Sequence, residues 1–397
     1  HLVFGHRIEV LAVSVNNHEM SLTGHAVDLQ HPTPSLDQAR SWAQALGFSG
    51  LSVVPLPAPD SAASMQGYRD WLAQGYAGDM AYLHRHLDIR EQPEALLPGA
   101  RSVLMVTMPY LPASSPADWR EEESRATNDP VRAVVSVYAR GRDYHKVLRQ
   151  RLVRLAEQLG GAYGPAQFRA CVDSAPIREV DYAEQAGLGW RGKNTLLLNQ
   201  AEGSMFFLGA LVTDLVFPSI PAERSHHCGS CTACLDLCPT QAFIGPYRLD
   251  ARKCISYLTI EHPGDIPESL RPGIGNRVYG CDDCQRVCPW NRYAKRATVP
   301  DFDVRHGLDR AGLIALFSWT EEEFSARHRG SAILRIGYSR WLRNIAVGLG
   351  NALAAACRNG SRAQAEEIRA ALLARADTSD GLVARHVAWA LKQGSVA

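Results

Sequence analysis

Long hydrophobic runs are missing from this sequence of 397 residues. The strongest apolar stretch, MFFLGALV, is far shorter than the roughly 20 residues that cross a membrane. We also expect no secretory signal, because the first residues lack a basic start, an apolar centre and a cleavage site. An excess of one charge is missing as well, since 42 Lys and Arg oppose 41 Asp and Glu. A nucleic-acid partner would therefore have to meet a local basic patch.

Cysteine is where the sequence departs from an ordinary globular composition. Ten are present, and four of them lie in the run CGSCTACLDLCPT: Cys228, Cys231, Cys234 and Cys238. Their C-x2-C-x2-C-x3-C-P spacing is typical of bacterial two-cluster ferredoxins, in which the cysteine before proline binds the other cluster. A second run, CDDCQRVCPW, adds Cys281, Cys284 and Cys288.

The second run lacks its first cysteine, because Val278 stands in that position and Cys254 is the nearest spare thiol. The spacing predicts two 4Fe-4S clusters, one held by Cys228, Cys231, Cys234 and Cys288 and the other by Cys238, Cys254, Cys281 and Cys284. Two zinc sites or disulfides are the alternatives. Cys171 and Cys357 lie in apolar runs and are predicted to be core residues. Thiolate-held clusters indicate electron transfer in a reducing compartment, the cytoplasm.

Hydrophobic periodicity predicts four parts. Residues 1–34 show little periodicity and are predicted to be an extension of uncertain order. Residues 35–217 mix helical stripes with apolar strands, near 51–56, 103–108, 168–172 and 205–212, without a strict βαβ rhythm, which favours an α+β domain. A helix capped by Asp143 is expected to stop at Gly160 and Gly161. The cysteine module spans 218–300, and residues 301–397 predict short helices of a HEAT-like repeat.

One carboxylate is a candidate catalyst. Asp173 directly follows the predicted strand at 168–172, where catalytic carboxylates are frequent. Buried beside a cofactor, its pKa would rise, and the protonated acid could serve as a proton donor. The alternative is that Asp173 only caps a helix beyond Pro176.

The glycine-rich run AGLGWRGKNT gives a weaker signal. Gly187, Gly189 and Gly192 have Gly-x-Gly-x-x-Gly spacing, but they follow a helix-like segment rather than a strand, which excludes a nicotinamide site. The run either offers amide donors to a polar cofactor or forms an ordinary turn.

Six runs in order carry a family resemblance: YARGRDYHKV, VDSAPIRE, AGLGWRGKNTLLL, CGSCTACLDLCPT, CISYLTIEHPG and YGCDDCQRVCPWN. Together they resemble the epoxyqueuosine reductases, from about residue 35 to the C-terminus. The resemblance implies a cobalamin held by the N-terminal domain beside two 4Fe-4S clusters. It also implies removal of the epoxide oxygen of epoxyqueuosine at the wobble position of a tRNA, with Asp173 as proton donor.

The same resemblance implies the cobalamin contacts. They are Tyr138, Arg140, Asp173, Asn194, Thr195, Leu197, Ser204 and Ser256. The DxHxxG motif of some cobalamin proteins is absent, so we expect a base-off cofactor without a histidine ligand from the protein. An external electron donor such as flavodoxin or ferredoxin is implied as well.

A tRNA substrate requires basic side chains, and residues 324–365 hold seven arginines and no acid. Arg335, Arg340 and Arg343 are the predicted RNA contacts, with Tyr338 and Trp341 placed to stack on bases. The alternative is a solvated helical face. Two other functions remain open, a corrinoid reductase of a small organic substrate and a ferredoxin-type electron relay.

Overall fold

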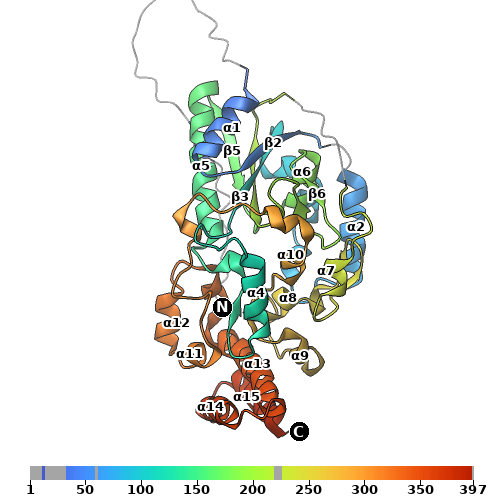
Figure 1. Cartoon of the computed structure of the whole chain (residues 1–397). Helices are drawn as coiled ribbons and strands as arrows, with labels where there is room; N and C mark the ends of the chain where they lie inside the picture. Colours follow the sequence, from blue (N-terminus) through green and yellow to red (C-terminus); the bar gives the residue numbers. More distant parts are fainter. Residues whose placement is uncertain (1–10, 14–32, 59–60, 219–225, 396–397) are drawn as a thin grey trace, which may run out of the picture.

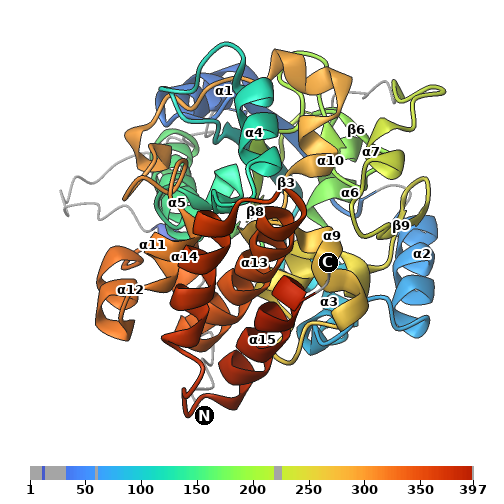
Figure 2. The same cartoon turned by 60° about the horizontal axis from the view of Figure 1, so that its bottom comes forward.

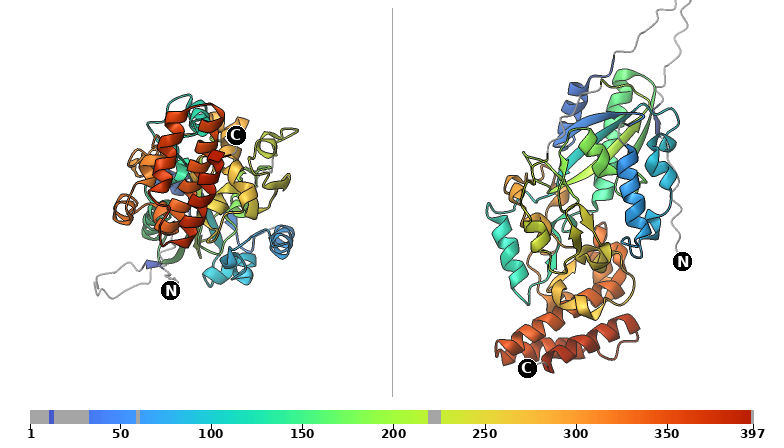
Figure 3. Two further views of the ribbon diagram at one scale, coloured as in Figure 1. Left: turned by 90° about the horizontal axis from the view of Figure 1, so that it is seen from below. Right: turned by 90° about the vertical axis from the view of Figure 1, so that its right-hand side faces the viewer.

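The computed structural model describes residues 11–13, 33–58, 61–218 and 226–395. A part built on a sheet lies at one end of the molecule, a helical C-terminal part lies at the other, and the cysteine-rich segment lies between them (Figures 1 and 3). Within these ranges, no helix is both long and apolar enough to cross a membrane.

Five strands form the main sheet, and every neighbouring pair is antiparallel. Their order is β1 (Leu11–Val13), β5 (Ala166–Cys171), β8 (Phe206–Thr213), β3 (Ser102–Pro109) and β2 (Gly50–Pro55). The four longer strands coincide within two residues with those predicted, so the expected mixture of strands and helices is confirmed. β1 comes from the predicted extension 1–34 and pairs with β5, while residues 1–10 and 14–32 lie outside the described ranges.

Helices cover both faces of the sheet. Leu104, Val106 and Met108 of β3 share a core with α1 (Leu36–Ala45) and α5 (Tyr144–Tyr163). Val103 and Met105, on the opposite face, share a core with α6 (Glu179–Gln185). A strand that is buried on both faces needs apolar residues at every position, which explains the unbroken run VLMV.

Short segments complete this part. They are α2 (Ser61–Ala73), α3 (Leu87–Glu91), α4 (Trp119–Asn128), β4 (Val134–Val135), β6 (Trp190–Arg191) and β7 (Leu197–Leu198). Asp143 caps α5 as predicted, by accepting a hydrogen bond from the His145 amide. The helix does not stop at Gly160 and Gly161 but continues to Tyr163, and Gly164, with φ of 89°, ends it.

The cysteine segment contains only short elements. They are α7 (Ala233–Asp236), β9 (Phe243–Gly245), β10 (Arg248–Leu249), α8 (Ile255–Ile260), α9 (Arg271–Ile274), β11 (Arg277–Tyr279) and α10 (Asp283–Arg286). β11 pairs in parallel with β4, so the segment is joined to the sheet-containing part through backbone hydrogen bonds.

Five helices follow: α11 (Leu313–Phe317), α12 (Glu321–Arg327), α13 (Gly337–Arg358), α14 (Arg362–Leu373) and α15 (Gly381–Lys392). α13 packs between α14 and α15 on one side and the cysteine segment on the other (Figure 2). Trp341 and Ile345 of α13 share one core with Leu258 and Val278 of the cysteine segment. The predicted division at residue 300 is therefore not a division between two cores.

Candidate active site

A cavity of about 420 Å³ lies where the sheet-containing part meets the cysteine segment. Seven of the eight predicted cobalamin contacts line it: Tyr138, Asp173, Asn194, Thr195, Leu197, Ser204 and Ser256. Its lining also includes the four cysteines of one predicted cluster: Cys238, Cys254, Cys281 and Cys284. We call this space the inner cavity. It brings the candidate proton donor and one candidate electron carrier to the same site.

Arg140 is the predicted contact that the structure does not place there. Its side chain is buried, and its guanidinium makes two ion-pair hydrogen bonds with Glu123, at 2.5 and 2.6 Å. Its Nε also donates to the Val135 carbonyl. With its donors taken up inside the protein, Arg140 is a structural residue, and the prediction of a cofactor contact was wrong.

Asp173 follows β5, as predicted, and occupies the left-handed region with φ of 45°. The Tyr144 hydroxyl donates to Asp173 Oδ2 at 2.6 Å, and His145 Nε2 lies 2.9 Å from the same oxygen. His145 Nδ1 lies 2.8 Å from Asp143 Oδ1, so the imidazole bridges two carboxylates. Tyr144 stacks on Phe207, with ring centroids 4.3 Å apart, which fixes the hydroxyl toward Asp173.

The charges of this group differ from the expectation for Asp173. Burial would raise the pKa of Asp173, but the hydrogen bonds from His145 and Tyr144 outweigh it and hold the pKa below its ordinary value. Burial likewise opposes a charged His145, but Asp143 and Asp173 outweigh it and raise the pKa of His145 to about 9. At neutral pH the proton is therefore held by His145, and the expectation that burial keeps Asp173 protonated was wrong.

The second set of cysteines surrounds a separate cavity of about 200 Å³, which we call the outer cavity. It gathers Cys228, Cys231, Cys234 and Cys288. Cys231 is exposed, and Lys193 Nζ donates to the Gly229 and Cys231 carbonyls. Asn194 lines both cavities and so lies between the two sets of cysteines.

The cysteines are thus grouped as the spacing predicted. No group of three or more His, Cys, Asp or Glu side chains in the described ranges is placed to hold a single metal ion. Four thiolates around a cavity suit a cluster of four irons, whose ligands stand farther apart than those of one zinc ion.

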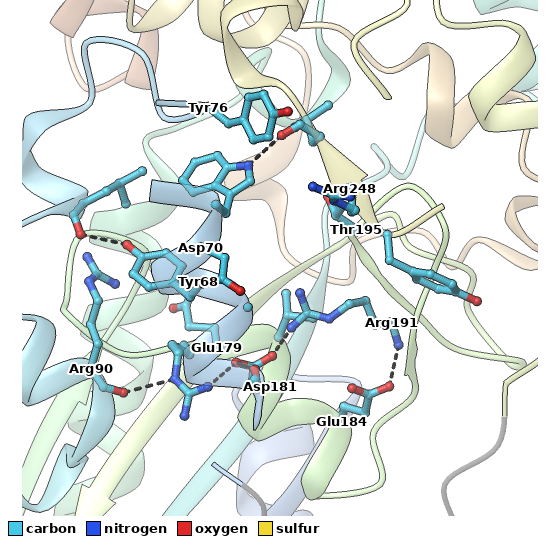
Figure 4. Close-up of a pocket in the computed structure, with 18 of the residues that line it drawn as sticks. Tyr68, Asp70, Tyr76, Arg90, Glu179, Asp181, Glu184, Arg191, Thr195 and Arg248 are labelled. Carbon is cyan, nitrogen blue, oxygen red and sulfur yellow. Dashed lines mark hydrogen bonds and ion pairs between the residues drawn. The ribbon is translucent and has the colours of Figure 1, made fainter. Parts of the chain in front are cut away.

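A third cavity, of about 870 Å³, adjoins the inner cavity and shares Glu179 and Thr195 with it (Figure 4). Asp181 lies in its wall between two cations, since Arg178 Nη1 donates to it at 2.7 Å and Arg191 also contacts it. This network is internal, and it fixes α6 against β6. We call this space the larger cavity.

The glycine-rich run does not form an anion cradle. A Cβ at Gly189 would lie 2.1 Å from the Leu198 carbonyl oxygen, and one at Gly192 would lie 2.6 Å from the Leu198 side chain. These glycines allow β6 to lie against β7, and the two strands position Asn194 and Thr195 in the turn between them.

The arginine-rich segment is only partly available to RNA. Arg335 is exposed and pairs with Glu261. Arg340 is half-buried and donates to the Ile336, Ile260 and Arg335 carbonyls. Arg343 and Trp341 are fully buried, so the predictions that they contact RNA were wrong.

Comparison with known proteins fits this geometry. Residues 90–174 match the family described as epoxyqueuosine reductase QueG, DUF1730, and residues 227–291 match the 4Fe-4S double cluster binding domain. An epoxyqueuosine reductase of Alicycliphilus denitrificans is 50% identical over 356 residues, which cover 89% of this chain and 97% of the relative.

The chain belongs to the epoxyqueuosine reductase family.

Other relatives agree with this membership. The epoxyqueuosine reductase of Escherichia coli K12 is 46% identical over 355 residues, covering 89% of this chain and 88% of that protein. A crystal structure of an epoxyqueuosine reductase with an epoxyqueuosine-modified stem loop of tRNA-Tyr is also similar. It is 25% identical, with a TM-score of 0.73, and the match covers 90% of this chain and 98% of that one. The family is one of oxidoreductases, which favours the enzyme over a simple electron relay.

Glu179 was missed by the sequence reasoning. Its Oε1 accepts a hydrogen bond from the Asp173 amide at 2.8 Å, and its side chain lines both the inner and the larger cavity. The signals were its position six residues after Asp173, at the start of a helix, and its place at the end of the run VDSAPIRE. That position alone does not distinguish an acid in a helix's first turn from a group in a site.

Proposed function

We propose that this chain reduces epoxyqueuosine to queuosine in tRNA, using cobalamin and two 4Fe-4S clusters. The observation that supports this most directly is the inner cavity, where Asp173 and four cluster cysteines share one space. Membership of the epoxyqueuosine reductase family gives the substrate. The reduction breaks both C–O bonds of the epoxide, forms a C=C bond and releases water. It therefore consumes two electrons and two protons.

The residues of the inner cavity fit a corrinoid. Leu197, Phe206 and Ile255 offer apolar surface, and Asn194, Ser204 and Ser256 offer amide and hydroxyl groups for polar substituents. None of the described residues that line this cavity is a histidine, in keeping with a base-off cofactor. The cobalt centre, when bound, would take single electrons from the adjacent cluster and deliver them to the substrate.

The two sets of cysteines give electrons a direction of travel. The outer cavity reaches the surface at Cys231, and Asn194 separates it from the inner cavity. We expect an external one-electron carrier, such as flavodoxin or ferredoxin, to be the source of the electrons; Cys228, Cys231, Cys234 and Cys288 would hold the cluster that accepts them, and the inner set of cysteines would hold the one beside the cavity. This chemistry requires a reducing compartment, which is why we place the protein in the cytoplasm.

Asp173 supplies a proton to the oxygen as it leaves carbon. His145 Nε2 lies 2.9 Å from Asp173 Oδ2, so the pair holds one proton at the cavity even though the pKa of Asp173 is low. As negative charge develops on the leaving oxygen, Asp173 passes this proton on and His145 replaces it. The aromatic stack of Tyr144 and Phe207 keeps the donor in place.

The C-terminal helices are the proposed support for the RNA. α14 and α15 both pack on α13, the arrangement expected of a HEAT-like unit. Arg335 lies just before α13, is exposed and pairs with Glu261, and it is the predicted RNA contact whose guanidinium is most accessible to a phosphate.

The proposed function is tested with anaerobically reconstituted protein, added cobalamin, a chemical reductant and an RNA stem-loop that carries epoxyqueuosine. We expect mass spectrometry of the nucleosides to show loss of one oxygen atom from the modified base. Absence of conversion by protein whose absorption spectrum shows both clusters and bound cobalamin would contradict the proposal.

A further inference from the structure

Glu179 is a half-buried acid that the mechanism above leaves without a role. It is the first residue of α6 and lies at the boundary between the inner and the larger cavity (Figure 4). Its Oε1 is occupied by the Asp173 amide at 2.8 Å, which places the two carboxyl groups on the same short loop. Among the residues that the structure describes, the hydrogen bond from the Asp173 amide is the one that the Glu179 side chain makes, and it leaves the second carboxyl oxygen free.

The charged groups around Glu179 favour its neutral form. Burial is the largest influence, and the negative Asp173 adds to it, whereas the Asp173 amide, His145 and Arg90 act in the opposite direction. The balance raises the pKa of Glu179 to about 8. Glu179 therefore carries a proton at neutral pH, while neighbouring Asp173 is ionised.

The reaction needs more protons than the Asp173–His145 pair holds. Two protons must reach the departing oxygen, and that pair stores one. We propose that Glu179 is the store of the second proton, placed at the cavity wall beside Asp173. This inference rests on the proposed function and assigns a donor to the second proton, for which the Asp173–His145 pair does not account. Asp173 gives the first proton to the alkoxide that forms when the first C–O bond breaks. Glu179 gives the second, so that the oxygen leaves as water when the C=C bond forms, and the two electrons come from the external carrier through the clusters.

Two substitutions separate proton supply from positioning. Glu179→Gln keeps an oxygen that accepts from the Asp173 amide and imitates the neutral acid, but it has no proton to give. Glu179→Ala removes both features. Glu184→Gln is the matched control, because Glu184 lies on the same helix and accepts from the Arg191 amide at 2.9 Å, but does not line the inner cavity.

The measurement is single-turnover reduction of the stem-loop across pH, with iron content and RNA affinity as checks on folding. Wild-type turnover should fall as pH rises through about 8, because Glu179 loses its proton there. Glu179→Gln should lose at least tenfold at neutral pH and should lack this limb, while Glu184→Gln should keep the wild-type pH dependence. The infrared band of a protonated carboxylic acid should be present in the unliganded wild type at pH 7, disappear near pH 8 and be absent from Glu179→Gln.

Each other result overturns the assignment. Wild-type turnover by Glu179→Gln, with or without loss in Glu179→Ala, would reduce Glu179 to a positioning residue for Asp173. If Glu179→Gln lost iron or RNA affinity, its turnover could not be interpreted, and the infrared spectrum of the wild type would decide. Absence of the carboxylic acid band from the wild type at pH 7 would reject Glu179 as the proton store. Inactivity of the wild type itself would instead count against the proposed function.

Discussion

Asp173 depends on a backbone conformation that few side chains adopt. Its φ of 45° lies in the left-handed region, which Asp tolerates better than β-branched or bulky residues. The strand β5 brings the chain to this point, and the Glu179 carboxyl and the Tyr144 hydroxyl hold the amide and the side chain of Asp173. The left-handed turn aims the carboxylate at His145.

Replacing Asp173 by Asn tests its role as the proton donor. Asn has nearly the same shape, but it cannot pass a proton from His145 to the departing oxygen. We expect turnover to fall about 10²- to 10⁴-fold, the usual contribution of general acid catalysis, with iron and cobalamin contents unchanged. Asp214→Asn is the control, because Asp214 accepts from the Gln167 amide outside the three cavities. Turnover near that of the wild type in Asp173→Asn would remove Asp173 from the mechanism.

At this scale the sequence predicted where Asp173 lies, directly after a strand, but not its charge. A carboxylate after a buried strand was visible as a pattern, and so was the resemblance of the run around it. The charge of Asp173 depends on His145, which lies 28 residues earlier in the chain and reaches it only after folding. Burial alone would have given the opposite protonation state.

Among the elements, the loop before α8 contributes one predicted cluster ligand from outside the two cysteine runs. Cys254 is the N-cap residue of α8 and lines the inner cavity with Cys238, Cys281 and Cys284. Replacing Cys254 by Ser should lower bound iron by about half, because the outer set of cysteines remains complete. Iron analysis and the absorption spectrum measure this, with Cys357→Ser as the control, since Cys357 contacts the Gly394 carbonyl and neither cavity. Unchanged iron would show that the ligands are paired differently.

Two arginines near the start of α13 look equivalent in sequence but differ in burial: Arg335 precedes the helix, and Arg343 lies within it. Arg343 is buried and donates to the Leu258, His262 and Gly264 carbonyls, so Arg343→Met leaves buried acceptors without donors. We expect it to cost about 3 kcal/mol or more of unfolding free energy.

Arg335→Glu should leave the melting temperature nearly unchanged, because its pair with Glu261 is at the surface, but should raise KM for tRNA and flatten its salt dependence. Thermal melts and RNA titrations measure both, and the reverse pattern would place the RNA elsewhere.

The periodicity predicted the strands and the C-terminal helices well, because burial of one or both faces leaves a mark in local sequence. It did not reveal that α13 shares its core with the cysteine segment. A buried arginine such as Arg343 looks like a surface residue in a sequence, since its carbonyl partners lie 79 or more residues away. Contacts over such distances leave no local pattern.

Across the whole molecule, the order of the parts fits the electron path proposed above. The outer cavity lies at the surface, the inner cavity lies against the sheet, and Asn194 lies between them. The shared core of the cysteine segment and α13 holds this order in one structure. On this proposal the donor approaches near Cys231, where the outer set of cysteines is exposed.

Arg292 provides a test of that approach. It is exposed, lines the outer cavity and lies over the ring of Tyr293, whose side chain is also exposed. Residues 286–297 contain further cations and no acid, so an acidic carrier protein would be attracted to this rim. Arg292→Glu should slow reduction of the clusters by an acidic flavodoxin or ferredoxin at low salt. It should leave reduction by dithionite unchanged, because a small reductant needs no docking surface.

The control for this prediction is Arg310→Glu, which makes the same charge change at an exposed arginine that lines none of the three cavities. Stopped-flow absorbance of the clusters gives both rates, and the difference between the variants should shrink as salt screens the attraction. If both variants slowed the carrier protein equally, the effect would come from net charge. If Arg292→Glu also slowed dithionite, the substitution would have damaged the cluster itself. Only a selective loss with the protein donor places electron entry at the outer cavity.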